Sequence, residues 1–124
     1  MTKRVVLVAM SALAITTLQT GCSDKALTYQ TDIKPILEAN CVSCHVPGEK
    51  GYEKSGLLLN SYEGLMKGTK FGAVVVPGSS VSSTMYRLVS GKADPTIHMP
   101  HGKSLLPKET VAMIGSWIDQ GAKY

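Results

Sequence analysis

The chain has 124 residues, with 13 basic and 9 acidic side chains and a formal charge of +4. This length predicts one domain, and 44% hydrophobic with 18% charged residues excludes a disordered chain. Two of the basic side chains, Lys3 and Arg4, belong to an N-terminal leader, so the remainder is close to neutral. The sequence has no basic stripe with interleaved aromatic residues, so we expect no nucleic-acid partner.

Residues 1–21 have the pattern of a secretory signal peptide. Lys3 and Arg4 precede an uncharged, mostly apolar run (residues 5–18), and small residues then lead to Cys22. An uncleaved membrane anchor is the alternative, but it needs about 20 predominantly apolar residues, and this run ends in polar ones. In both cases we expect the rest of the chain to lie outside the cytoplasm.

Residues 18–22 resemble the lipobox of bacterial lipoproteins. Gly21 before Cys22 fits that motif, whereas Gln19 departs from it, since that position usually holds Leu or another apolar or small residue. The resemblance implies a lipid on Cys22, with ordinary signal cleavage as the alternative, and Ser23 implies sorting to the outer membrane. We therefore expect a membrane-anchored periplasmic lipoprotein in which residues 22–27 tether a domain of residues 28–124.

The domain is expected to begin with an amphipathic helix that ends at residue 41. Four apolar side chains recur there at helical spacing, namely Tyr29, Ile33, Ile36 and Leu37. Thr31 or Asp32 is the expected N-cap. Pro35 would fall in the first turn, where its missing N–H costs little.

Residues 41–45 form a Cys-Val-Ser-Cys-His motif, which matches the C-x-x-C-H signature of c-type haem attachment. Two thiols at this spacing reach the two vinyl groups on one edge of a porphyrin and become thioethers. His45 then presents its imidazole to the iron from the same side, as the usual proximal ligand. We therefore predict one covalent haem c on Cys41, Cys44 and His45.

Other chemistries of the two thiols stay open. Cys41 and Cys44 could form a redox dithiol, although that function requires a βαβ context, or a disulfide in an oxidising compartment. With His98 and His101 they could bind zinc, but Cys44 and His98 are much farther apart than the roughly 12–15 residues of a zinc finger. Haem would leave only Cys22 unused, and lipidation would account for it.

Several further elements are expected after the motif. Residues 46–56 read as a polar, glycine-rich loop, residues 61–68 as a short helix with Ser61 as cap and Gly68 as stop, and residues 71–76 as extended loop. Residues 82–90 read as a third helix. Residues 107–120 read as the last helix, with Pro107 near its start. Its apolar stripe is expected to contain Val111, Ile114, Trp117 and Ile118.

The sixth iron ligand is expected from the Met99 loop (residues 94–102). Pro100 disfavours helix at Met99, which suits a thioether held on a loop and directed at a haem. His101, and less directly His98, are alternative ligands. Three other methionines, Met66, Met85 and Met113, are expected to pack in the core instead. Ligation by His45 and Met99 leaves no open iron position, which favours electron transfer over catalysis.

The order of the short motifs resembles that of class I mono-haem cytochromes c, in particular the planctomycete-type domain. The resemblance covers about residues 28–124. It rests on segments 29–37 and 41–45, the Gly-Leu-x-Leu of 56–59, the Val-Pro-Gly of 76–78, the Met-Pro of 99–100 and the Trp-Ile-x-x-Gly-Ala of 117–122.

The resemblance implies a small all-α fold of about four helices with long loops around one haem, and a first helix packed on the last through Ile33, Ile36, Trp117 and Ile118. It implies an electron carrier of the cell envelope, not an enzyme, with separate redox proteins as partners. Two alternatives remain: a haem enzyme or gas or peroxide sensor with a labile sixth ligand, and a non-haem lipoprotein with a disulfide or zinc. Dispersed lysines could form a docking face or simply be solvated surface.

Overall fold

The computed structural model describes residues 25–124, and the expected leader and Cys22 lie outside them. Within this range the chain is helical, without a strand, which confirms the all-α fold. The elements are η1 (Tyr29–Ile33, a π-helix), α1 (Lys34–Asn40), α2 (Lys50–Ser55), α3 (Tyr62–Lys67), α4 (Thr84–Val89) and α5 (Lys108–Asp119). None of the helices in this range is long and apolar enough to cross a membrane.

The first helix forms as expected over residues 29–40, as η1 followed directly by α1. Its N-cap is Thr28 and not Thr31 or Asp32, because the Thr28 hydroxyl accepts the Thr31 N–H. Asp32 instead points its buried carboxylate back to the helix start and accepts the N–H of Thr28 at 3.0 Å. The two side chains therefore cap the helix reciprocally. Pro35 lies in the first turn of α1, as predicted.

Asp32 gives the fold a specific acid sensitivity. Hydrogen bonds from the Lys25 side chain, the Thr28 backbone and the Thr31 side chain lower the pKa of its carboxyl well below the ordinary 3.8. Because the folded state depresses this pKa, the stabilisation is complete above pH 4 and is lost as the pH falls. We expect Asp32→Asn to lower the unfolding midpoint at pH 7, and the deficit to shrink progressively below pH 4. Thermal unfolding across pH checks this, with Glu49→Gln, at an exposed acid, as control.

The region after the motif differs from the expected loop, because residues 50–55 form the helix α2. The glycine and charged residues suggested a loop, but they form a short helix of six residues. This helix ends at Gly56, which adopts a left-handed φ of 72°. The fold therefore has five α-helices in the described residues, not about four.

The next helices follow the predictions more closely. α3 begins after Ser61, whose hydroxyl accepts the Gly64 N–H at 3.0 Å, and ends at Gly68. Residues 71–76 form a loop, as predicted, but it is not extended throughout: it holds a turn at Phe71, an isolated bridge between Thr69 and Gly72, and a bend at Val74. α4 is shorter than the expected 82–90 helix.

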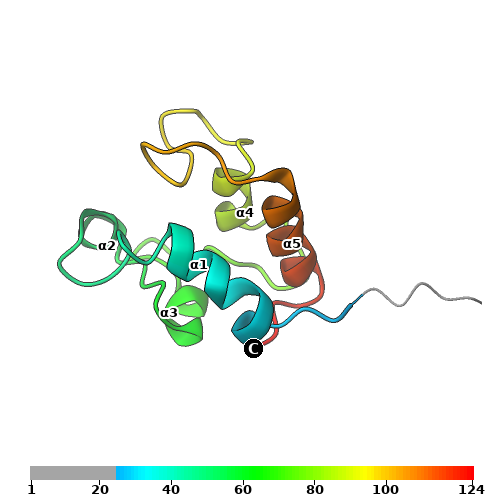
Figure 1. Cartoon of the computed structure of the whole chain (residues 1–124). Coiled ribbons are helices and arrows are strands. Elements are labelled where there is room, and N and C mark those ends of the chain that lie inside the picture. The colour runs from blue at the N-terminus through cyan, green and yellow to red at the C-terminus, as the bar shows by residue number, and fades with distance from the viewer. Residues whose placement is uncertain (1–24) are drawn as a thin grey trace, which may run out of the picture.

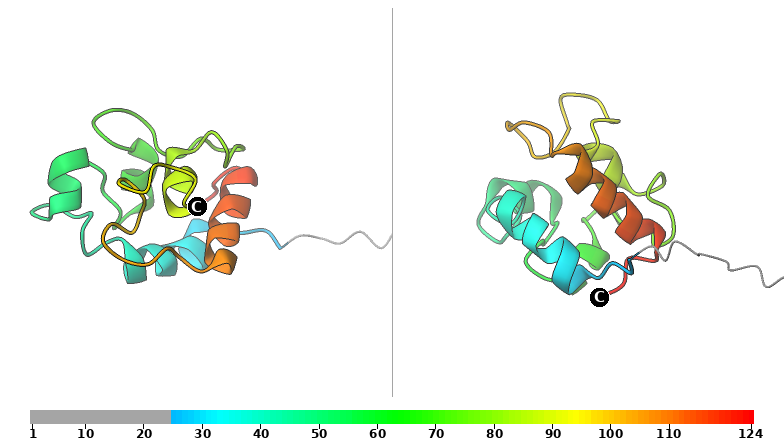
Figure 2. Two further views of the ribbon diagram at one scale, coloured as in Figure 1. Left: turned by 90° about the horizontal axis from the view of Figure 1, so that it is seen from above. Right: turned by 45° about the vertical axis from the view of Figure 1, so that its right-hand side comes forward.

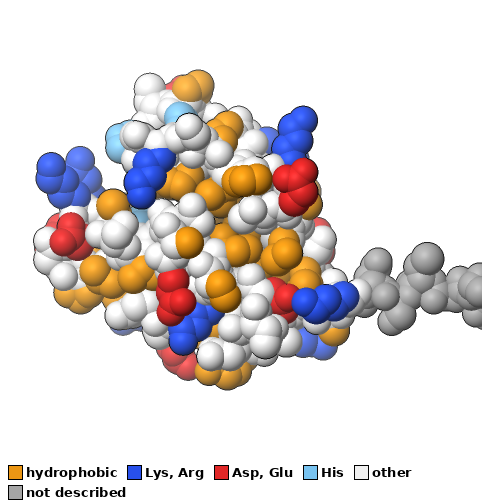
Figure 3. Space-filling view, in the orientation of Figure 1, with side chains coloured by type: hydrophobic (Ala, Val, Ile, Leu, Met, Phe, Trp, Pro, Cys, Tyr) orange, Lys and Arg blue, Asp and Glu red, His pale blue; other side chains and the backbone are white. Residues whose placement is uncertain are grey.

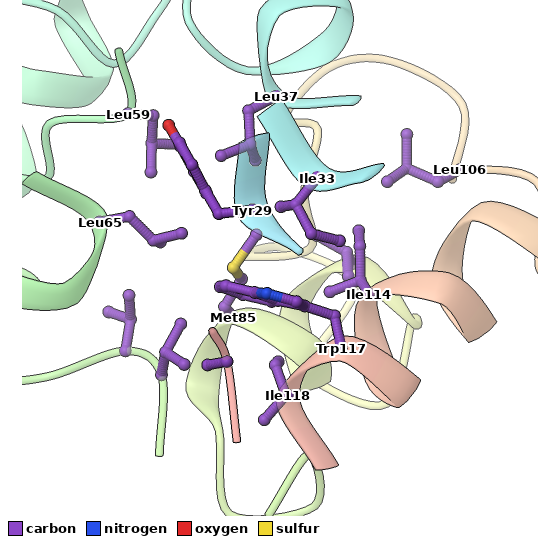
Figure 4. Close-up of a cluster of buried hydrophobic side chains, with 14 residues drawn as sticks. Tyr29, Ile33, Leu37, Leu59, Leu65, Met85, Leu106, Ile114, Trp117 and Ile118 are labelled. Carbon is purple, nitrogen blue, oxygen red and sulfur yellow. The ribbon is translucent and has the colours of Figure 1, made fainter. Parts of the chain in front are cut away.

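The core lies between η1, α4 and α5. Trp117 is fully buried in its middle, with Ile33 on one side and Met85 on another (Figure 4). η1 contacts α5, so the first helix does pack on the last, as expected, through its π-helical part. Ile33, Trp117 and Ile118 are fully buried, whereas Ile36 is only half-buried at the margin of the core.

The methionines divide between core and surface. Met85 is buried and Met66 is partly buried against the core, as expected. Met113 was expected in the core, but its side chain is 38% exposed. On α5 the buried face is formed by Ile114, Trp117 and Ile118, and Met113 lies outside it. Met113 is therefore a surface residue.

The helices are arranged so that residues 41–45 and the Met99 loop lie away from the chain termini. In Figure 1, α1 rises from the lower right to the upper left, α2 lies at the far left, and the loop between α4 and α5 is at the top. The N-terminal segment (residues 25–28) leaves on the opposite side, beside the C-terminus. The right-hand view of Figure 2 shows the same separation.

Candidate haem-binding site

The C-x-x-C-H turn (residues 41–45) directly follows α1. The N–H groups of Cys44 and His45 both donate to the Cys41 carbonyl at 3.1 Å, and His45 N–H also donates to the Val42 carbonyl at 3.1 Å. This compact turn places two thiols and one imidazole within five residues. Both thiols are free; Cys44 is exposed and Cys41 half-buried.

The two thiols have different environments. Burial raises the pKa of Cys41 to about 11, while the charge of Lys103 and that of Cys44 act in opposite directions on it. The raised pKa of Cys41 reflects this burial and fits a thiol that lies against apolar surroundings.

The surroundings of the His45 imidazole favour its neutral form. Burial lowers its pKa, and the nearby Leu57 backbone counteracts part of this shift. Its Nδ1 is buried without a hydrogen-bond partner. Neutral imidazole is the form that binds metals. A half-buried imidazole whose Nδ1 lacks a hydrogen-bond partner, beside two free thiols, is compatible with the covalent haem that the motif predicts.

Gly51 on α2 contributes to this site, and the sequence analysis missed it. A Cβ at residue 51 would lie 2.6 Å from the Cys44 carbonyl oxygen and 3.0 Å from His45 Cε1. The absence of a side chain lets α2 pack directly on the turn, where Tyr52 N–H donates to the Cys44 carbonyl at 3.0 Å. From the other side, Leu59 N–H donates to the His45 carbonyl at 3.0 Å. The sequence did not indicate this role, because Gly51 lies in a segment that was expected to be a loop.

We expect Gly51→Ala to displace the C-x-x-C-H turn. The added methyl group would overlap backbone at Cys44, and overpacking of this kind costs about 1–3 kcal/mol. Thermal unfolding of the haem-loaded protein should show a lower midpoint, together with a perturbed haem spectrum. Lys54→Ala, at an exposed position of the same helix, should leave both unchanged. An unchanged midpoint in Gly51→Ala would contradict the close packing of α2.

Met99 lies on a loop, as predicted, and is partly buried against the core. Its N–H donates to the Leu88 carbonyl at 3.1 Å, which fixes the loop to α4. The following Pro100 is buried, after a cis peptide bond. The two neighbouring histidines differ: His98 is half-buried and His101 is exposed. Of the three candidate ligands, Met99 is therefore the one with an apolar contact to the core.

The Met99 loop and the C-x-x-C-H turn face each other. Lys103, just after the loop, is close enough to Cys41 for its charge to lower the pKa of that thiol. Figure 3 shows hydrophobic side chains exposed in the region between the part that contains α2 and the loop joining α4 to α5. Within residues 25–124 no three His, Cys, Asp or Glu side chains come together as a metal site. The end of the Met99 loop thus lies near the C-x-x-C-H turn, and exposed hydrophobic side chains lie between these two parts of the molecule.

Comparisons with known proteins agree with this arrangement. The small, all-helical fold and the C-x-x-C-H motif are those expected of a c-type cytochrome. The family model described as Planctomycete cytochrome C matches residues 41–101, so this part of the chain is similar to planctomycete-type cytochrome c domains. The match spans the motif, α2 to α4 and the Met99 loop, and leaves η1, α1 and α5 outside it. No curated protein and no solved structure matches the chain. Haem c is the cofactor that this family implies.

Proposed function

We propose that this chain is a mono-haem c-type cytochrome that passes single electrons between redox proteins of the bacterial cell envelope. Cys41 and Cys44 would form the thioether links, His45 would be one axial ligand and Met99 the other, with His101 as the alternative. The observation that supports this most strongly is the half-buried His45, whose Nδ1 is unpartnered, on the same turn as two free thiols.

The bound haem supplies a one-electron Fe(III)/Fe(II) couple. The protein residues fix the ligands and keep water away. Backbone hydrogen bonds hold the C-x-x-C-H turn, and Gly51 lets α2 cover one side of it. The bond from Met99 N–H to Leu88 holds the loop on α4. An electron carrier needs little rearrangement between its two redox states, and a site held on both sides by backbone hydrogen bonds supplies this rigidity.

We propose further that residues 1–21 direct export and are removed, that a lipid on Cys22 anchors the chain to the outer membrane, and that the domain works in the periplasm. The support is the leader pattern and the Leu-Gln-Thr-Gly-Cys sequence of residues 18–22. Export agrees with c-type attachment, which takes place outside the cytoplasm.

Carbon monoxide binding tests the carrier against an enzyme or sensor. If His45 and Met99 both ligate the iron, the reduced protein should not bind carbon monoxide, and it should exchange electrons rapidly and reversibly with a small redox mediator. A reduced spectrum that shifts fully in carbon monoxide would identify an open or labile position. That result would replace the carrier with a ligand-binding haem protein.

A further inference from the structure

The N-terminal segment (residues 25–28), of which residues 25–27 were expected to belong to a short polar tether, is bound to the domain. The Leu27 N–H donates to Gln120 Oε1 at 2.8 Å, and Gln120 Nε2 donates back to the Lys25 carbonyl at 3.2 Å. The Lys25 ammonium lies 2.6 Å from Asp32 Oδ1. These contacts tie the segment to the end of α5 and to the start of the first helix.

The same part of the domain holds the C-terminus. Tyr29 N–H donates to the Lys123 carbonyl at 2.8 Å, and Trp117 Nε1 donates to that carbonyl at 2.8 Å. The Tyr124 ring stacks on Tyr29, with centroids 6.0 Å apart. We call this region the anchor end and define it by Lys25, Leu27, Gln120, Lys123 and Tyr124.

The surface of the anchor end is partly apolar. Tyr124 is 64% exposed although its ring packs on the core aromatics on one side. A shallow groove between the N-terminal segment and α5 is lined partly by apolar residues (Leu27, Ala112, Met113) and partly by polar ones (Lys25, Glu109, Ser116, Gln120). An exposed tyrosine with a polar hydroxyl and an apolar ring suits a boundary between water and lipid.

Chain length limits the distance between the anchor end and the lipid. Three residue steps separate Cys22 from Lys25, which is at most about 10 Å of chain. The first helix then extends over 12 residues from Tyr29 to Asn40, about 18 Å along its axis, before the C-x-x-C-H turn begins. Figure 1 shows α2 and this turn on the opposite side of the domain from the N-terminal segment.

We propose that the anchor end rests on the lipid surface and that the C-x-x-C-H turn and α2 face the water. The proposal rests on the lipidation of Cys22 put forward above. The lipid would be joined to the domain only through residues 22–24 and the N-terminal segment, which is bound to the domain. The domain therefore cannot rotate freely relative to the membrane. The haem-bearing side is thereby presented to partners that approach from the aqueous phase.

Lysine footprinting of the full-length, haem-loaded lipoprotein tests the orientation. The protein is reconstituted into phosphatidylethanolamine–phosphatidylglycerol vesicles, treated with a water-soluble, amine-reactive ester, and analysed by mass spectrometry. A detergent-solubilised sample gives the reference rates. We expect Lys25 and Lys123 to react several-fold more slowly on vesicles, and the exposed Lys50 and Lys54 on α2 to react at unchanged rates.

A tether variant provides the control. About 12 Gly/Ser residues inserted between Asp24 and Lys25 add about 20 Å of flexible reach, so the protection of Lys123 should be lost. Slower labelling of Lys50 and Lys54 on vesicles would overturn the orientation. So would labelling rates on vesicles that equal the detergent rates at all four lysines. The intact mass is measured in parallel: a missing acyl mass would overturn the lipidation and the orientation together, whereas acylation with the wrong footprint would overturn the orientation alone.

Discussion

Replacing both Cys41 and Cys44 with serine is expected to leave a chain that lacks covalent haem and folds poorly. α2, α3 and α4 have only six residues each, and isolated helices shorter than about 12–15 residues are marginal in water. They depend on packing, and without haem the hydrophobic side chains near the C-x-x-C-H turn would lack their largest apolar partner. We expect the double variant, purified without haem, to lose most of its helical circular dichroism signal.

The control for this variant is Ser43→Ala, which changes an exposed side chain of the same turn. It should retain both the haem and the helical signal. Native-like helix content in the double variant, with a cooperative thermal transition, would contradict the view that haem completes the core. The protein core of Trp117, Ile33 and its neighbours would then be sufficient by itself.

The second large effect is expected from Met99→Ala. A thioether ligand raises the potential of a haem whose other ligand is histidine. Its loss should lower the midpoint potential by on the order of 100 mV, a modest part of the ~0.8 V that axial ligands span. The red charge-transfer band of the oxidised protein should disappear, and the reduced protein should gain carbon monoxide binding.

Met113→Ala is the matched control, because Met113 is exposed on α5 and lies outside the Met99 loop. It should keep the band and the potential. If Met99→Ala retains both, the sixth ligand is not Met99, and His101 becomes the first alternative to test.

The long first helix and the last helix could be predicted because their apolar spacing extends over three turns. Ile33, Trp117 and Ile118 are fully buried in the structure, as their spacing indicated. The N-cap was wrong because Thr28 and Asp32 cap the helix together, and the residue type alone does not distinguish this from a cap at Thr31 or Asp32.

The short helix α2 could not be predicted, because a six-residue helix with a glycine and three charged residues has the composition of a loop. It forms where Gly51 allows a close approach to Cys44, which is a tertiary effect. Met113 was misplaced for a different reason: its apolar character suggested the core, but residue 113 lies outside the buried face of α5, which is formed by Ile114, Gly115, Trp117 and Ile118.

The residues of the candidate site could be proposed from the sequence, but the surroundings of these residues could not. The C-x-x-C-H spacing named the three attachment residues from the sequence, and the match to the cytochrome c family includes all of them. The unpartnered Nδ1 of His45, the raised pKa of Cys41 and the position of Lys103 near that thiol depend on the fold. These features come from residues far apart in sequence, so no local pattern encodes them.

The most direct test of the account is an optical spectrum, oxidised and reduced, of the chain produced in a host with haem-attachment machinery. The account predicts a c-type spectrum with one covalent haem per chain and a red charge-transfer band in the oxidised form. A preparation without a Soret band would contradict it, and Cys41 and Cys44 would then return to a disulfide or metal site.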